Sequence, residues 1–298
     1  MPDPARARHA VGGLLLAAGL LAGANARAAE GAPAWAPPQA LEPGMRELRF
    51  ADGSVYRGTV LNGLPHGRGQ YVARAFRYEG EWRDGVKQGE GVYQWANGDR
   101  YEGGFARDHP DGRGMFVFAN GDTYDGEVHA GVIQGRGTYI ARNGDTFEGA
   151  FHDGRPDGVG RYLFANGDRY EGEVRAGRIQ GRGRYFAANG DRIECSFVDG
   201  KAQGIGTYAF ANGDRYEGEI IRGVPSGQGA FDYADGARYE GEVREGRPMG
   251  RGTYRLADGS RFEGTFADGL ARATGELVGA HGSRMPAELR DGVPRLLN

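Results

Sequence analysis

The stretch that decides the fold is one period of a repeat, ANGDRYEGEVRAGRIQGRGRYFA, at residues 165–187. Its central phrase is Tyr170-Glu171-Gly172, and the position of Tyr170 recurs along the chain as an aromatic residue, with one isoleucine. Each step is 23 residues long except the first, which is 22. Self-similarity at a fixed period of this length is typical of repeat architectures. The recurring residues are Tyr56, Tyr78, Tyr101, Tyr124, Phe147, Tyr170, Ile193, Tyr216, Tyr239 and Phe262.

Each period contains two short runs of alternating apolar and polar residues separated by turn residues, which predicts β-hairpins. One turn has the sequence Ala-Asn-Gly or Ala-Asp-Gly. A three-residue loop there places Phe116 opposite Tyr124, and Gly114 opposite Gly126. A slip of one residue would move Phe116 to the other face, so burial of the rings favours this loop. The expected fold is all-β: an elongated, twisted, single-layer antiparallel β-meander of tandem 23-residue hairpins, with one aromatic face and one charged face.

The composition excludes several classes of protein. Gly accounts for 56 of the 298 residues, whereas its usual share is about 7%. Because Gly destabilises a helix interior by roughly 1 kcal/mol relative to Ala, a helical protein is excluded. A hydrophobic content of 39% argues against a compact enzyme with one large core. The net charge of −3 gives no basic excess for nucleic-acid phosphates, so we expect no nucleic-acid partner.

Residues 1–28 have the composition of a secretory signal peptide. A short basic head precedes an apolar run at residues 11–23, which is too short for a membrane span of about 20 residues. Small residues then predict cleavage between Ala28 and Ala29. Residues 29–44 contain four prolines and are predicted to form a Pro/Ala-rich linker. We therefore expect an exported protein, periplasmic or secreted, with envelope association as an alternative.

The phrases Tyr170-Glu171-Gly172-Glu173 and Tyr101-Glu102-Gly103 closely resemble the MORN (membrane occupation and recognition nexus) repeat. The resemblance extends over residues 45–292, as ten repeats with degenerate terminal half-units, and leaves residues 293–298 as a tail. It implies a curved, twisted gutter. Together with the signal sequence, it makes the chain similar to an exported bacterial member of this family. Ile193 and Cys195 depart from the pattern, because the seventh repeat has them where the others have an aromatic residue and Gly.

No motif predicts catalysis, a cofactor or a metal site. The Asp ladder after the turn glycines suggests calcium, but each Asp can instead hydrogen-bond turn amides. The Glu ladder on the charged face lacks the two different environments that an acid–base pair needs. Cys195, opposite Gly183, has no nearby His to activate it and is predicted to be a buried filler. The Asp ladder comprises Asp99, Asp122, Asp145, Asp168, Asp191 and Asp214, and the Glu ladder comprises Glu79, Glu102, Glu148, Glu171, Glu217 and Glu240.

The aromatic face remains as the candidate site. Packing between repeats explains most of the rings, but a single-layer sheet cannot cover both faces, and a long exposed apolar groove usually marks a binding or self-association surface. We therefore expect a non-enzymatic scaffold that binds a protein partner, or itself, along this groove. The candidate groove residues are Tyr101, Tyr124, Phe147, Tyr170, Tyr216 and Tyr239.

Two membrane functions are alternatives. The family name implies membrane attachment, and a peripheral, phospholipid-binding role is weakly supported. Recognition of anionic lipid needs clusters of Lys or Arg, and the alternation of Arg and Glu here provides none. An outer-membrane β-barrel fits the signal sequence but needs strands of about 9–11 residues, whereas the runs predicted here have about five or six.

The elongated repeat array makes a direct prediction for solution scattering. A compact domain of the size of the mature chain has a radius of gyration of about 18–19 Å. We expect small-angle X-ray scattering to give a clearly larger value and a rod-like profile. A measured value of about 18–19 Å would contradict the solenoid.

Overall fold

The computed structural model describes residues 44–279 and 281–297, so the predicted signal peptide and nearly all of the linker lie outside the described residues. The regular secondary structure of the described residues is all β-strand, as predicted. None of their segments is a helix long and apolar enough to cross a membrane. The chain divides into two compact units, one ending at Ala165 and the other beginning at Asn166. The sequence does not signal this division, because the repeat period continues unchanged through it.

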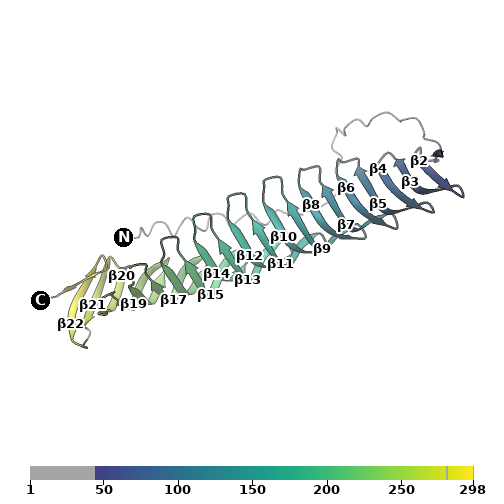
Figure 1. The fold of residues 1–298 in the computed structure, drawn as a ribbon. Helices are drawn as coiled ribbons and strands as arrows, with labels where there is room; N and C mark the ends of the chain where they lie inside the picture. The colour runs from purple at the N-terminus through teal and green to yellow at the C-terminus, as the bar shows by residue number, and fades with distance from the viewer. Residues whose placement is uncertain (1–43, 280, 298) are drawn as a thin grey trace. The chain divides into compact units, whose positions relative to one another are not determined.

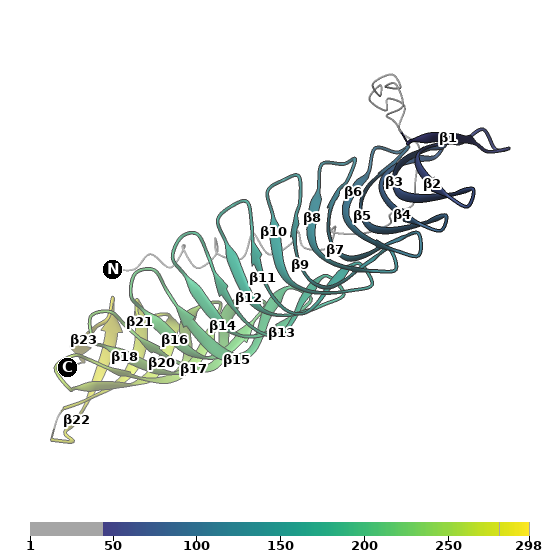
Figure 2. The ribbon, with the colours of Figure 1, turned by 45° about the vertical axis from the view of Figure 1, so that its right-hand side comes forward.

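The N-terminal unit is an antiparallel meander in which each strand pairs with the next one along the chain (Figure 1). Its strands are bowed rather than straight (Figure 2). The first strand pairs with the first full repeat, as expected for a terminal half-unit. The strands are β1 (Arg46–Arg49), β2 (Val55–Leu61), β3 (Leu64–Val72), β4 (Phe76–Arg83), β5 (Val86–Trp95), β6 (Arg100–Ala106), β7 (His109–Val117), β8 (Thr123–His129), β9 (Val132–Ile140), β10 (Thr146–His152) and β11 (Arg155–Leu163).

The C-terminal unit repeats the same plan. Here one prediction is wrong, because part of the expected tail at 293–298 is the strand β23. Asp291 and Gly292 have φ of 49° and 76°, so they form a tight turn that returns the chain to β22. The strands are β12 (Arg169–Arg175), β13 (Arg178–Phe186), β14 (Arg192–Val198), β15 (Lys201–Ala209), β16 (Arg215–Ile221), β17 (Val224–Asp232), β18 (Arg238–Arg244), β19 (Arg247–Arg255), β20 (Arg261–Asp268), β21 (Arg272–Val278), β22 (Arg284–Arg290) and β23 (Val293–Leu296).

The three-residue loop predicted for the Ala-Asn-Gly turns is confirmed. The Phe118 N–H donates to the Asp122 carbonyl at 2.9 Å, and Gly121 has φ of +93°. Phe116 consequently pairs with Tyr124, and glycines pair with glycines on the same face. The first step of the repeat is a residue short because its turn, at residues 74–75, has two residues, and the aromatic pairing there is nevertheless kept.

The other turn of each repeat contains a feature that the sequence analysis did not predict. Its two residues, Ala130 and Gly131 in the fourth repeat, have φ of 49° and 83°. The register shifts between Gly126 and Val128, where a β-bulge places Glu127 of β8 opposite three residues of β9, 134–136. The ladder resumes beyond the bulge, so β8 and β9 have seven and nine residues, longer than the predicted runs. The Gly131 N–H donates to the Pro110 carbonyl at 2.8 Å, which ties this turn to the preceding repeat.

The core of every repeat except the seventh is an aromatic ring that lies over a pair of facing glycines. Tyr124 is 0% exposed, and a Cβ placed on Gly137 would lie 2.4 Å from its ring. The Tyr124 hydroxyl donates to the Glu127 carbonyl at 2.9 Å, across the bulge. The ring edge contacts Phe151 of the next repeat, with centroids 5.1 Å apart and planes at 80°. A single-layer sheet thus buries its rings between its own backbone and the neighbouring repeat.

Candidate interaction surface

The structure places all six predicted groove residues in the core. Tyr101, Tyr124, Tyr170, Tyr216 and Tyr239 are 0% exposed, and Phe147 is 1% exposed. This corrects the interpretation of these rings as an open groove. The reason is that the paired glycines let each ring lie flat on the backbone, and a ring of the next repeat also covers Tyr124, Tyr170 and Tyr239. The apolar surface that a partner can reach is made by other residues.

A second row of rings on the same face remains partly accessible. Phe50, Trp95 and Phe118 stand directly before a turn and Phe76 directly after one, whereas Tyr71 and Tyr93 hold the cross-strand ring position. They are half-buried, except that Phe50 is 41% exposed. We call this row in the N-terminal unit the aromatic strip. It consists of Phe50, Tyr71, Phe76, Tyr93, Trp95 and Phe118.

The rings of the aromatic strip form a continuous series. Phe76 and Tyr93 are stacked, with centroids 4.7 Å apart and planes at 11°. Phe118 stacks on the buried Phe116 at 5.6 Å and 6°, and Phe116 in turn contacts Trp95. Stacking of this kind holds the rings in fixed orientations before any partner arrives. The remaining centroid distances are 5.7 Å for Phe50–Tyr71, 5.6 Å for Tyr71–Phe76 and 4.5 Å for Tyr93–Trp95.

The aromatic strip was missed in the sequence analysis, which followed only the most regular position of the repeat. In the sequence it is marked by an aromatic residue that directly precedes a turn and lies on the same face of the strand as the buried rings. In the C-terminal unit the same position holds Phe210 and Tyr233, and both contact the ring of Phe231. Phe164, at the end of the N-terminal unit, also holds this position and stacks on Tyr162, but Ala141 interrupts the row between Phe118 and Phe164, and Ala187 contributes no ring.

Tyr93 has an unusual environment within the aromatic strip. In other repeats the equivalent hydroxyl bonds the Asp of the preceding turn, as Tyr208 does with Asp191 at 3.0 Å. Phe76 stands at that Asp position for Tyr93, because the turn before it lacks the Asn-Gly-Asp sequence. Burial raises the pKa of Tyr93 to about 12, so its hydroxyl is a neutral donor at physiological pH.

A buried cation lies beneath the aromatic strip. The Lys87 ammonium is 5.2 Å from the Phe76 ring centroid and 5.8 Å from that of Tyr93. Its side chain is only 12% exposed, and Nζ lies 3.3 Å from Oδ1 of Asp108. Cations over ring faces are attracted by the ring quadrupole. Neighbouring repeats have Pro at the position of Lys87, so this charge is specific to this part of the chain.

The Asp ladder has a structural role. Asp122 Oδ1 accepts the Arg142 N–H of the next turn at 2.8 Å, and its other oxygen accepts the Tyr139 hydroxyl. Asp168 and Asp191 make the same connections in the C-terminal unit. These carboxylates tie consecutive turns together, as capping groups rather than ligands. Among residues 44–279 and 281–297 no cluster of three or more His, Cys, Asp or Glu side chains could hold a metal ion.

Cys195 is a buried residue opposite Gly183, as predicted. It is compatible with the repeat because Ile193 replaces the Tyr whose ring would otherwise cover this position. Burial raises the pKa of the thiol to about 11, so it is protonated and poorly nucleophilic at neutral pH.

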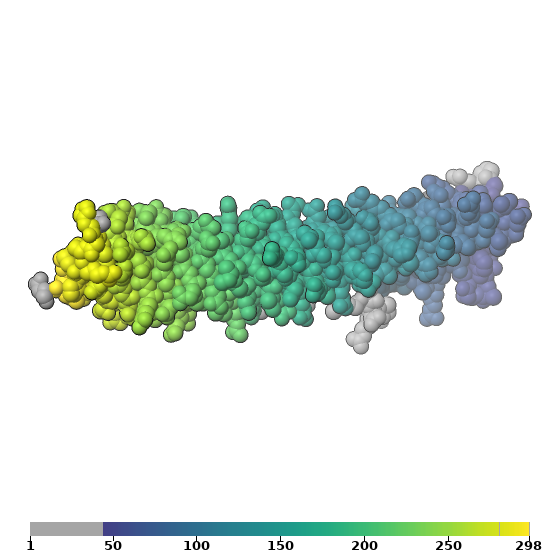
Figure 3. Space-filling view, turned by 90° about the horizontal axis from the view of Figure 1, so that it is seen from below, coloured from purple at the N-terminus to yellow at the C-terminus, as the bar shows by residue number. Residues whose placement is uncertain are grey.

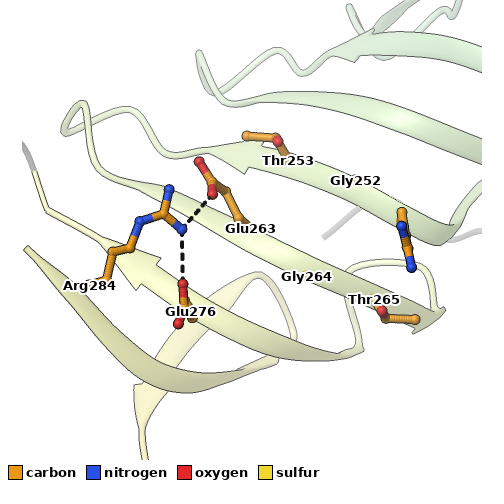
Figure 4. Close-up of a pocket in the computed structure, with 8 residues that line it drawn as sticks. Gly252, Thr253, Glu263, Gly264, Thr265, Glu276 and Arg284 are labelled. Atoms are coloured by element: carbon orange, nitrogen blue, oxygen red, sulfur yellow. Dashed lines mark hydrogen bonds and ion pairs between the residues drawn. The ribbon is translucent and has the colours of Figure 1, made fainter. Parts of the chain in front are cut away.

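The opposite face of the sheet is charged. Arg113 and Glu127 face each other across β7 and β8, but Arg113 approaches Asp125, at 4.0 Å, while the Glu127 carboxylate accepts the Arg136 N–H. At the end of the C-terminal unit this face has an open depression of about 820 Å³ (Figure 4). Arg284 bridges Glu263 and Glu276 there, at 3.0 and 2.9 Å, so these charges neutralise one another. The side of the molecule shown in Figure 3 has no deep hollow among the described residues.

Comparison with protein families identifies the repeat. The family model for the MORN repeat matches nine segments of the chain. It omits residues 193–195, which include Ile193 and Cys195, and the tenth repeat. The matched segments are residues 56–73, 78–100, 101–123, 124–146, 147–169, 170–192, 196–215, 216–238 and 239–261.

Curated relatives share only short segments with the chain. Alsin of Rattus norvegicus is 40% identical over 58 residues, which are 17% of this chain and 4% of Alsin. Protein TIC 100 of Arabidopsis thaliana is 49% identical over 45 residues, 14% of this chain and 5% of that protein. The chain therefore spans a small fraction of these relatives. Among solved structures, the TCP10 domain of Danio rerio CPAP is 18% identical with a TM-score of 0.37, over 61% of this chain and 91% of that domain.

The buried tyrosines predict instability in alkali. Burial raises the pKa of Tyr101 and Tyr216 to about 12, whereas an unfolded Tyr has a pKa of about 10. The folded state therefore binds these protons more tightly, so its stability is complete below about pH 10 and falls as the pH rises toward 12. We expect the urea midpoint to fall between about pH 9 and pH 11, with tyrosinate absorbance appearing as β-structure is lost. Tyrosines that ionise near pH 10 while the fold stays intact would contradict this.

Proposed function

Because this chain belongs to the MORN repeat family, we propose that it is a non-enzymatic scaffold that binds a protein partner, or a second copy of itself, through the aromatic strip. MORN repeats are generally protein or membrane interaction modules, and the proposal assigns that role to one surface of this chain. The observation that carries it is the series of stacked, half-buried rings from Phe50 to Phe118.

The aromatic strip has the properties of an interface. Aromatic residues are enriched at the energetic centres of interfaces, because they bury much area at little cost in side-chain entropy. Here the stacking has already fixed their orientations, which reduces the ordering cost of binding. Hydrogen-bond capacity is present as well, in the Tyr93 hydroxyl and the indole N–H of Trp95. A partner can therefore find both apolar area and polar anchors in one row.

In the described part of the chain, the side chains considered for catalysis are engaged in structural contacts, as expected for a scaffold. The carboxylates of the Asp ladder are engaged in backbone hydrogen bonds, and the buried Cys195 is held as a thiol. Each unit instead presents the same side chains at regular intervals, which suits an extended contact.

We also propose that the protein is exported. The proposal rests on the basic head, the 13-residue apolar run at residues 11–23 and the small residues before Ala29. Intact-mass measurement of protein recovered from the cell envelope or medium is expected to show Ala29 as the first residue. Full-length chain found in the cytosol would contradict export.

Substitution in the aromatic strip tests the interaction. The partner is first captured from envelope extract with the mature chain, identified, and its affinity measured with purified components. Trp95→Ala is expected to weaken binding by about 2 kcal/mol or more, roughly 30-fold, because the indole is a central ring of the strip. The folded fraction is checked by circular dichroism.

The matched control lies on the charged face. Glu148→Ala removes a side chain paired with Arg161 at 2.7 Å on an exposed surface and is expected to leave binding unchanged. If Glu148→Ala abolishes binding while Trp95→Ala does not, the functional surface is the charged face.

A further inference from the structure

We propose that the aromatic strip is covered, in the chain on its own, by the Pro-rich segment of the same chain, residues 29–43. This goes beyond the proposed function, because it concerns what occupies the strip before a partner binds. The occupant and the surface are adjacent in sequence: the segment ends one residue before Gly44, and the strip begins at Phe50.

The surface has the chemistry that receives a polyproline II helix. Pro-rich segments dock on rows of aromatic side chains, which contact the flat faces of the proline rings. Phe76, Tyr93 and Trp95 supply consecutive rings with centroids 4.7 and 4.5 Å apart. Since a polyproline II helix has no internal hydrogen bonds, its carbonyls are available to donors. The Tyr93 hydroxyl and the Trp95 indole N–H are such donors on the strip.

The segment has the complementary composition. Residues 29–43 read AEGAPAWAPPQALEP, with four prolines, one Trp and one Leu. Prolines fix φ near −65° and lower the entropy that is lost on docking. Because the Lys87 ammonium beneath the strip is already paired with Asp108, the pairing rests on apolar contact and on hydrogen bonds to the carbonyls of the segment.

The reach of the segment is sufficient. Fifteen residues in polyproline II conformation extend about 46 Å at 3.1 Å per residue. The backbone from Gly44 to Phe50 is at most about 20 Å long. From β1 to β7 the strip crosses six strand spacings, about 29 Å. The segment can therefore fold back from Gly44 and cover most of the aromatic strip.

Hydroxyl-radical footprinting of the intact mature chain tests this directly. The oxidation rates of Trp35 in the segment and Trp95 in the strip are measured by mass spectrometry, with Tyr233 of the C-terminal unit as an internal reference. We expect Trp35 to be protected several-fold relative to a synthetic peptide of residues 29–43, and Trp95 to be protected several-fold relative to a chain that lacks this contact.

Two variants remove the contact from opposite sides. Replacement of Pro33, Pro37 and Pro38 by Ser is expected to raise the oxidation rate of Trp95 several-fold and leave Tyr233 unchanged. Tyr93→Ala is expected to raise the rate of Trp35 in the same way. The Ser variant leaves every residue of the described strands unchanged, so a folding defect is not expected to complicate its result.

Several outcomes would overturn the proposal. Trp35 oxidised as fast in the wild-type chain as in the free peptide means that the segment does not dock. Protection that disappears on dilution identifies a second copy as the occupant. Either result leaves partner binding by the strip untouched, because that is measured separately with Trp95→Ala.

Discussion

An aromatic ring that lies flat over two facing glycines is the contact on which the rest of this structure depends. In the fourth repeat Tyr124 covers Gly126 and Gly137, and a Cβ on either glycine would lie 2.4 Å from the Tyr124 side chain. A side chain on either glycine would overlap the ring, so the ring can occupy this position only if both facing residues are Gly. This requirement explains the paired glycines within the strands, where Gly is otherwise unfavourable, whereas many of the other glycines stand in turns at positive φ.

The functional surface is a consequence of the same contact. The principal rings of the repeats are buried in the core. The accessible aromatic surface is therefore made by the rings of the aromatic strip, which are held in place by stacking on their neighbours. The aromatic strip is most continuous in the N-terminal unit, where Phe76 replaces the turn Asp that other repeats use to bond a Tyr hydroxyl. With Phe76 after the turn at residues 74–75, the Tyr93 hydroxyl has no Asp partner. The rings of Phe76 and Tyr93 stack instead, with Lys87 beneath them.

Much of the fold could be predicted from the sequence, and the site could not. The pairing of Phe116 with Tyr124 follows from the length of the turn and from the alternation of side chains between the two faces of a strand. Both depend only on residues close together in the sequence. Exposure is different, because it depends on how far the strands bend and on what the next repeat covers. The bulge at Glu127 bends each hairpin, and nothing in the alternation of apolar residues reveals it. Tyr124 was therefore placed on the correct face but wrongly assigned to an open groove. The division at Ala165 likewise leaves no mark in the repeat.

The most direct test of this account is a double-mutant cycle between Gly137 and Tyr124, with free energies of unfolding measured by urea denaturation. Gly137→Ala alone is expected to destabilise by about 1–3 kcal/mol, because the new Cβ overlaps the ring. In a Tyr124→Ile background the same change is expected to cost much less, as the combination of Ile193 with Cys195 in the seventh repeat suggests. The account predicts a coupling energy of about 1 kcal/mol or more between the two positions. An equal cost of Gly137→Ala in both backgrounds would contradict it.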